Sequence, residues 1–275
     1  MKKIIMFLMA AFMLSVVPAT AQELSKSGKK ALKAKVKEFN KEGWKILAID
    51  SSGLVATVAV LEDDELIAEY TVNYKKTHSE TLLPMLDEIK SMINLDLSEI
   101  DAIAVTKGPG SFTGLRIGSA TVKGLAYALN VPIISVPTVD ALSMNLWGSD
   151  KLIVPVMDAR REQVYTGIYE FAGGEHTCIL EQDALSVEDL CKKINDLSRE
   201  VILLGDAVPV YKDKFDELIK VPHSYAPANM NRQKASSLGV LAFEYLRKGL
   251  TESAFDHKPE YLRLSQAERE RMERQ

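Results

Sequence analysis

Short apolar runs and turn residues alternate along the chain from Lys45 onward, and they predict strands. Residues 46–49, 54–61 and 66–72 each form a run rich in aliphatic and β-branched residues, which is typical of buried strands. The acidic turn at residues 62–65 separates the second run from the third. We therefore expect the folded part to open with three consecutive antiparallel strands.

Helical periodicity appears next. Apolar residues recur at intervals of three and four over residues 81–93, and residues 117–129 predict a second helix, rich in small residues. Strands at 102–106 and 133–136 and a helix at 139–146 complete a first lobe, expected over residues 45–150. Strands at 152–157, 163–169 and 201–204 predict a second lobe over residues 151–233. A helix within 234–248 is expected to pack back on the first lobe, before a tail at 249–275. The repeated order of elements predicts two related α/β lobes.

The first 44 residues differ from the rest. Lys2 and Lys3 precede an apolar run over 4–17 and a small-residue site at 19–21, so residues 1–21 have the layout of a secretory signal peptide. The run is short for a membrane span. Residues 22–44 are rich in lysine and predict a basic linker or helix. We interpret residues 1–44 as the beginning of an exported protein that is joined in frame to the folded part, either by gene fusion or by an error of sequence assembly. Whether residues 1–44 exist in the native protein stays open.

Composition narrows the function only slightly. An apolar fraction of 47% and a charged fraction of 26% are ordinary for a globular protein. A net charge of -4 provides no general attraction for nucleic acid, so any RNA contact needs a local basic patch or a basic partner. Two cysteines, Cys178 and Cys191, make neither a disulfide framework nor a zinc cluster.

The segment G-P-G-S-F-T-G-L-R, residues 108–116, is the most distinctive part of the chain. A glycine-rich turn between a strand and a helix allows close backbone approach and leaves helix amides unpaired. It suits a phosphate, another anion or a closely packed helix, but its spacing matches no standard nucleotide loop. A structural turn and a ligand site therefore both stay open. The residues of a vestigial nucleotide or anion site would be Asp50, Ser51, Ser52, Gly108, Gly110, Ser111 and Thr113.

Catalytic patterns are missing from the sequence. The four histidines, at positions 78, 176, 223 and 257, are scattered, whereas a chelating pair needs two at helical spacing. His78 and Glu80 stand at the start of a predicted helix, where a capping or packing role is favoured. Neither Ser111 nor Ser119 lies in a G-x-S-x-G turn. We expect no catalytic residue and no metal site.

Several motifs occur together and in order. They are I-L-A-I-D-S-S at 46–52, H-S-E-T-L-L-P at 78–84, V-T-K-G-P-G-S-F-T-G-L-R-I-G at 105–118, K-G-L-A at 123–126, D-A-R at 158–160 and P-E-Y-L-R at 259–263. With them the chain resembles the TsaB (YeaZ) family over residues 45–263. The resemblance covers nearly all of the folded part.

The resemblance implies a two-lobed actin-like ATPase (ASKHA) fold of the α/β class. It implies a non-catalytic partner or scaffold subunit that binds TsaD. Such a subunit supports threonylcarbamoyl transfer to the adenosine next to the anticodon of tRNA, giving N6-threonylcarbamoyladenosine. The expected protein has no cofactor of its own, with ATP and a metal on partner subunits. TsaE joins the assembly, homodimers use an overlapping surface, and tRNA is met only through the complex. A cytoplasmic location without membrane contact follows, in conflict with residues 1–21.

Docking through helices of the first lobe is also implied. Small residues along a helix let a partner backbone come close, although close packing within the lobe explains them equally well. Arg116 has two candidate roles, pairing with Asp50 or facing the partner. The candidate partner-binding residues are Thr81, Leu82, Met85, Leu86, Gly118, Thr121 and Gly124.

Two other functions stay open. An active ATP-dependent enzyme of the same fold would use Asp50 and the glycine turn, with Asp158 or Asp206 from the second lobe. A peptidase acting on the partner would need a nucleophile and a base, and no such pair can be identified in the sequence.

Overall fold

A computed structural model describes residues 43–63, 65–74 and 76–263. The signal-peptide-like segment, nearly all of the basic linker and the end of the tail lie outside the described residues. From Gly43 onward the chain clusters as one compact unit. The residue boundaries of the two lobes within that unit stay a prediction.

The first sheet contains the strands predicted for the first lobe. It has the order β3-β2-β1-β4-β5, in which β1, β2 and β3 pair antiparallel and β4 and β5 run parallel to β1. The strands are β1 (Lys45–Asp50), β2 (Ala56–Glu62), β3 (Glu65–Val72), β4 (Ala102–Gly108) and β5 (Ile133–Pro137). The three-strand antiparallel start is therefore confirmed.

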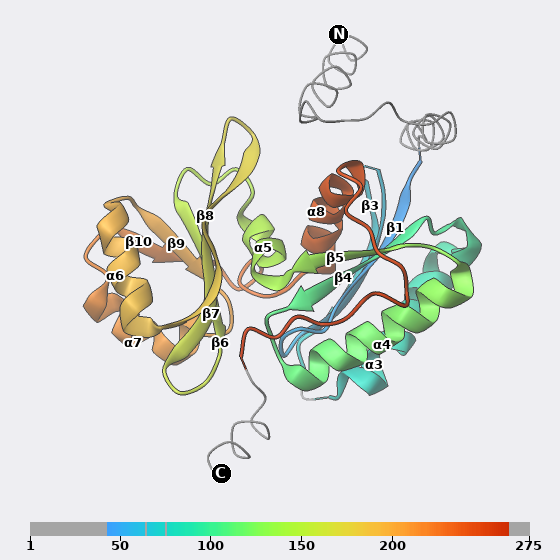
Figure 1. Cartoon of the computed structure of the whole chain (residues 1–275), viewed down its shortest axis with the longest axis horizontal. Coiled ribbons are helices and arrows are strands. Elements are labelled where there is room, and N and C mark those ends of the chain that lie inside the picture. Colours follow the sequence, from blue (N-terminus) through green and yellow to red (C-terminus); the bar gives the residue numbers. More distant parts are fainter. Residues whose placement is uncertain (1–42, 64, 75, 264–275) are drawn as a thin grey trace, which may run out of the picture. The chain divides into compact units, whose positions relative to one another are not determined.

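Helices cover both faces of this sheet, which explains why its central strands read as continuous apolar runs. On one face, Leu47 and Ile49 pack with α3 (His78–Ile93) and α4 (Phe112–Leu129) (Figure 1). On the other, Ile46 and Ala48 pack with α8 (Ala235–Arg247) and α5 (Thr138–Ser143). Alternate residues of β1 thus enter two different cores. A short 3₁₀ turn, Leu97–Glu99, precedes β4.

The second sheet has the order β10-β9-β6-β7-β8, which read backwards repeats the connectivity of the first. Helices α6 (Val187–Leu197) and α7 (Val208–Leu218) cover one face of it. The strands are β6 (Leu152–Asp158), β7 (Gln163–Ala172), β8 (Glu175–Ser186), β9 (Val201–Leu204) and β10 (His223–Tyr225). Two lobes of one design confirm the predicted actin-like α/β fold.

Several helix boundaries differ from the sequence prediction. Helix α4 begins at Phe112 rather than at 117, because Ser111 is its N-cap and accepts a hydrogen bond from the Gly114 amide at 3.3 Å. The glycine motif is therefore mostly helical rather than a turn. Helix α3 begins at His78 rather than at 81, and the helix expected over 139–146 is divided into α5 and the 3₁₀ turn Met144–Leu146. Elements β8, α6, α7 and β10 were missed.

Helix α5 joins the two sheets. Its residues Val139 and Leu142 are buried together with Ile153 and Met157 of β6. Beside them the Tyr169 hydroxyl donates to Asp140 Oδ1 at 2.5 Å. Burial raises the pKa of Asp140 to about 6, against the lowering effect of the Tyr169 hydrogen bond. Helix α5 thus carries, between the two sheets, a carboxyl group that is costly to ionise.

We predict that Asp140→Asn stabilises the protein near neutral pH. The pKa of Asp140 is about 6 in the folded protein against 3.8 in the unfolded chain, so its ionisation lowers the free energy of unfolding as pH rises through this window. Asparagine keeps an acceptor for Tyr169 and does not ionise. Thermal unfolding should show that the variant has a higher free energy of unfolding than the parent protein at about pH 7.5, by at most about 3 kcal/mol. This difference should shrink at about pH 4.5. An equal effect at both pH values would contradict this role.

Candidate functional site

The turn after β1 meets the start of α4 through backbone contacts. The Ser111 amide donates to the Ser52 carbonyl at 2.7 Å, and the Ser51 hydroxyl donates to the Gly114 carbonyl at 2.9 Å. His78 Nε2, at the start of α3, lies 2.9 Å from the Gly53 carbonyl and donates to it. Most residues predicted for an anion site are therefore brought together, and they contact one another.

The glycines of the motif are required by this contact. A Cβ atom on Gly110 would lie 2.3 Å from the Ser52 carbonyl oxygen, and one on Gly114 would lie 2.1 Å from that of Ser51. On Gly118 it would meet the Ser51 hydroxyl at 2.3 Å. At Gly110 and Gly114 these separations from fixed backbone oxygens are far below a van der Waals contact, so only glycine fits there, whereas at Gly118 the Ser51 hydroxyl would have to move. The protein's own β1 turn occupies the space that the missing side chains leave.

Gly108 must also be glycine, here because of a close contact with the backbone of Glu260. Its φ is +120°, in the region that favours glycine, and its Cβ would lie 2.2 Å from the Glu260 carbonyl oxygen. The Glu260 amide donates to the Lys107 carbonyl at 2.7 Å. The motif at 259–263 is therefore packed against the glycine motif, 150 residues earlier in the sequence. Sequence reasoning found both motifs but not their contact.

Asp50 is held inside the lobe. It is 1% exposed, and its Oδ1 accepts from the Ser52 amide, the Ser52 hydroxyl and the Thr106 hydroxyl at 2.8, 2.6 and 3.0 Å. Burial raises the pKa of Asp50, and the donors from Ser52 and Thr106 act in the opposite direction. Of the two roles left open for Arg116, pairing with Asp50 is not formed, because Asp50 accepts from Ser52 and Thr106 instead and Arg116 donates to Tyr261.

A cleft of about 1110 Å³ lies between the two sheets. Its walls include Ser52, Ser111 and Thr113 on one side and the β6–β7 hairpin on the other. Asp50 is not among its lining residues, whereas the second-lobe carboxylates Asp158 and Asp206 are. The cleft can accept a polar ligand, and the anion role of these residues stays a prediction.

Both second-lobe carboxylates stabilise the hairpin itself. Asp206 Oδ1 accepts from the Asp158 amide at 2.9 Å, and burial raises the pKa of Asp206. Asp158 Oδ1 accepts from the Arg160 amide at 2.8 Å and from the Tyr211 hydroxyl at 3.2 Å. These contacts help to hold a turn in which Arg160, Arg161 and Glu162 all have positive φ.

The predicted partner-binding residues fall into two groups. Five of them are buried, and the four on α3 belong to the core under the first sheet or border it. Thr121 is half-buried and Gly124 is exposed, with no atom within 4 Å of its Cβ direction. The buried five are Thr81, Leu82, Met85, Leu86 and Gly118. Their packing role is visible in the structure, and the docking role of the whole set stays a prediction.

The exposed side of α4 is a stripe at helical spacing, formed by Ala120, Gly124 and Tyr127. Tyr127 is 69% exposed and two turns away from Ala120. On α3 the exposed residue Leu83 was not predicted, although the helical period places it opposite the buried face. We call Ala120, Gly124 and Tyr127 the α4 stripe.

Arg116 has a contact that sequence reasoning did not foresee. Its Nε donates to the Tyr261 hydroxyl at 3.2 Å, and its guanidinium lies 5.8 Å from the centre of the Tyr261 ring and 5.9 Å from that of Phe112. No local pattern could have revealed this, because Tyr261 lies far away in the sequence. Arg116 therefore links α4 to the motif at 259–263.

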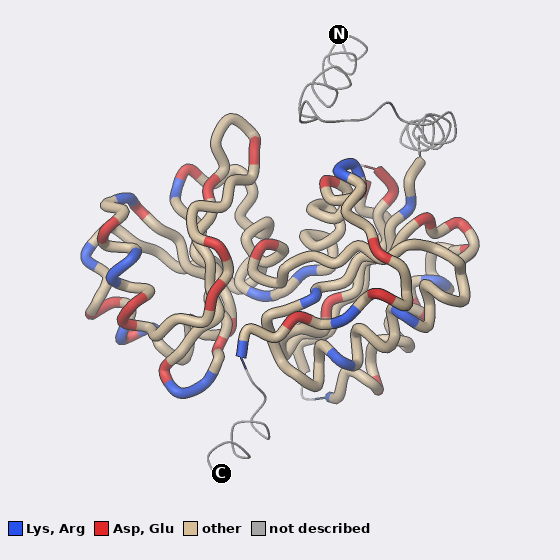
Figure 2. Tube along the Cα trace, viewed as in Figure 1, with Lys and Arg blue, Asp and Glu red and all other residues tan. Residues whose placement is uncertain are grey.

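Charges and metal-ligating side chains add little to the site. Basic and acidic residues are interspersed over the part of the chain that the structure describes (Figure 2). No group of three His, Cys, Asp or Glu side chains in the described residues is arranged to hold a metal ion. None of the described helices combines the length and the hydrophobicity that a membrane crossing needs.

We predict opposite results for alanine at two glycines of α4. Gly114→Ala places a methyl group against the Ser51 carbonyl, so it should lower the free energy of unfolding by about 2 kcal/mol or more. Gly124→Ala meets open space and should raise it by up to about 1 kcal/mol. Denaturant unfolding of both variants is the measurement. A Gly114 variant as stable as the parent protein would refute the packing role.

Comparison with known proteins agrees with this arrangement. The family model described as "TsaD: tRNA N6-adenosine threonylcarbamoyltransferase" matches residues 65–271. The tRNA threonylcarbamoyladenosine biosynthesis protein TsaB of Bacillus subtilis is 33% identical over 232 residues, 84% of this chain and 99% of that protein. TsaB of Escherichia coli is 28% identical, covering 80% of this chain and 94% of that protein.

A solved structure shows the same fold. YeaZ from Pseudomonas aeruginosa aligns with a TM-score of 0.69 at 26% identity, covering 80% of this chain and all of that chain. The sequence match to Bacillus subtilis TsaB spans almost the whole of that relative. The chain belongs to the TsaB (YeaZ) family.

Proposed function

We propose that this protein is a non-catalytic subunit in the synthesis of N6-threonylcarbamoyladenosine in tRNA, and that it binds a TsaD-type partner through the first lobe. Family membership supports the pathway, since its relatives carry the name tRNA threonylcarbamoyladenosine biosynthesis protein. The observation that carries the non-catalytic role is the glycine motif, whose missing side chains make room for the protein's own backbone.

The positions of the carboxylates support the same role. An ATPase of this fold would need carboxylates that reach a ligand in the cleft. Here Asp50 accepts three intramolecular hydrogen bonds and is 1% exposed, while Asp158 and Asp206 are occupied in fixing a hairpin. Each of the three carboxylates therefore already has a structural role, which favours packing over catalysis.

The α4 stripe is the part of the first lobe best suited to docking. Gly124 has open space in its Cβ direction and lies near the exposed Tyr127, so a partner helix could approach the backbone closely and pack on the aromatic ring. Leu83 on α3 extends the apolar surface. The partner belongs to the family whose model describes this fold, so it has a corresponding pair of helices to offer.

Further features of the proposed assembly follow from the family. TsaE joins the complex, TsaD carries the metal and ATP is handled by partner subunits, so this chain needs no cofactor. tRNA is contacted only through the complex, since charges of both signs are interspersed over the described residues (Figure 2). A homodimer would use the same stripe and would compete with TsaD. The protein acts in the cytoplasm, where its tRNA substrate is.

We predict that Gly124→Trp weakens binding of TsaD about tenfold or more, because the indole would keep the partner's backbone away from the stripe. Val240→Trp is the matched control, since Val240 is 48% exposed on α8, which packs on the opposite face of the sheet. Co-purification and calorimetric titration with TsaD measure the effect. Unchanged affinity in the Gly124 variant would contradict docking at the stripe. Tryptophan at Gly118 is unsuitable for this test, because it would disrupt the core.

We predict that the isolated protein does not turn over ATP, with or without Mg²⁺. Steady-state hydrolysis should equal the buffer rate, and Asp50→Asn should leave that rate unchanged. Hydrolysis well above the buffer rate that disappears in the Asp50 variant would establish the alternative function, an ATP-dependent enzyme.

A further inference from the structure

The segment of residues 253–263, which we call the strap, runs along α4 (Figure 1). Near the last turn of the helix, Phe255 meets Tyr127 edge-on, with ring centres 5.6 Å apart. In the middle, Lys123 Nζ donates to the His257 carbonyl at 2.9 Å. At the first turn, Tyr261 stacks on Phe112, with ring centres 4.4 Å apart and planes 5° from parallel. The strap therefore touches α4 at both ends and at its centre.

The contact at the first turn is the strongest of the three. Arg116 lies beside the stacked rings of Phe112 and Tyr261 and donates to the Tyr261 hydroxyl at 3.2 Å. Stacked aromatic rings and a cation near a ring each stabilise their geometry. Phe112 and Arg116 belong to α4, so their contacts with Tyr261 fix the rotamers of all three side chains.

The strap is also fastened to the sheet. Ile133 of β5 exchanges two backbone hydrogen bonds with Glu252, just before the strap begins. His257 is 1% exposed and its Nδ1 lies 2.8 Å from Glu252 Oε1. Lys107 of β4 pairs with Glu260 at 2.8 Å. Residues of the neighbouring parallel strands β4 and β5 thus fasten the strap and the residue before it to the first sheet.

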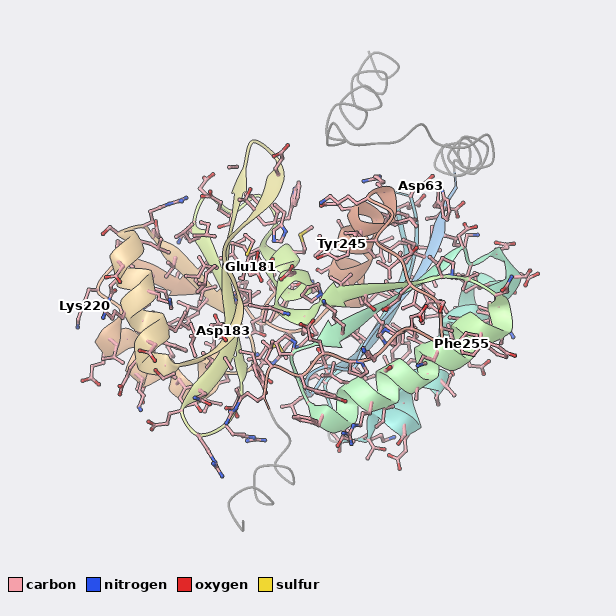
Figure 3. The ribbon with its side chains drawn as sticks, in the orientation of Figure 1. Asp63, Glu181, Asp183, Lys220, Tyr245 and Phe255 are labelled. Atoms are coloured by element: carbon pink, nitrogen blue, oxygen red, sulfur yellow. The ribbon has the colours of Figure 1, made fainter. Side chains whose placement is uncertain are left out.

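The strap ends at the second lobe. Arg263, its last residue, donates to the Ala159 carbonyl in the β6–β7 hairpin. At the other end, Phe255 is 79% exposed beside Tyr127 of the α4 stripe, and Figure 3 labels it close to that helix. One continuous segment therefore connects the cleft wall, strands β4 and β5 and the helix proposed to dock.

We propose that the strap positions α4 for partner binding, with Tyr261 as its main positioning residue. This inference rests on the proposed docking function of the α4 stripe. The inner side of α4 packs on the core, and the strap braces its flank at three points. A surface held in its bound geometry loses less conformational entropy on association. Releasing the strap should therefore weaken binding of TsaD without removing any residue of the stripe.

The test compares Tyr261→Ala and Tyr261→Phe with Tyr70→Ala. Phenylalanine keeps the stack and loses only the hydrogen bond to Arg116. Tyr70 on β3 is the control, because it is 43% exposed against 38% for Tyr261 and belongs to another part of the surface. Amide exchange of α4 in the isolated protein and affinity for TsaD are both measured. Tyr261→Ala should speed exchange at the start of α4 and weaken binding roughly five- to tenfold.

Tyr261→Phe should be close to the parent protein in both the amide exchange of α4 and the affinity for TsaD. Tyr70→Ala should equal the parent protein in both measurements. Normal exchange of α4, or normal affinity, in Tyr261→Ala would overturn the inference. Failure of the docking proposal is distinguished by Gly124→Trp. If that variant binds TsaD normally, then docking at the stripe is wrong, whereas a change in α4 exchange in Tyr261→Ala would still show the bracing contact.

Discussion

The close approach of two backbones, the turn after β1 and the first turns of α4, is the constraint on which the rest of the structure depends. Carbonyl oxygens of Ser51 and Ser52 occupy the positions that side chains on Gly114 and Gly110 would fill. This contact sets the distance between the helix and β1, and it buries the inner side of α4. The outer side of the same helix is thereby left to form the stripe and to receive the strap.

A comparable constraint occurs in the second lobe. Gly205, which follows β9, has a φ of +120° like Gly108, the last residue of β4, and its Cβ would lie 2.0 Å from the Val156 carbonyl oxygen. Strands β4 and β9 occupy equivalent places in the two sheets. Close backbone packing after the equivalent strand is therefore part of the architecture of both lobes.

Local patterns predicted the first lobe well because its strands are buried and its helices are amphipathic. They failed at β8, whose exposed and half-buried residues do not alternate regularly. Helix α6 was overlooked although Val187, Leu190 and Ile194 recur at helical spacing after the N-cap Ser186, so the local pattern was sufficient to predict it. The start of α4 was missed because glycines were taken as turn residues, whereas Ser111 caps a helix that contains them. Burial of Leu82 and Met85 follows from helical period, but the choice between core and docking face needed the position of the sheet. The contact of Arg116 with Tyr261 depends on tertiary structure alone.

The central claim is that this protein kept the geometry of an ATPase fold for packing and binds its partner through α4. Amide hydrogen exchange of the protein with and without TsaD tests it most directly. We predict new protection in α4 and in residues 253–263, with little change in the β6–β7 hairpin and in α6 and α7. Protection concentrated on the walls of the cleft, with exchange of α4 unaltered, would contradict the account.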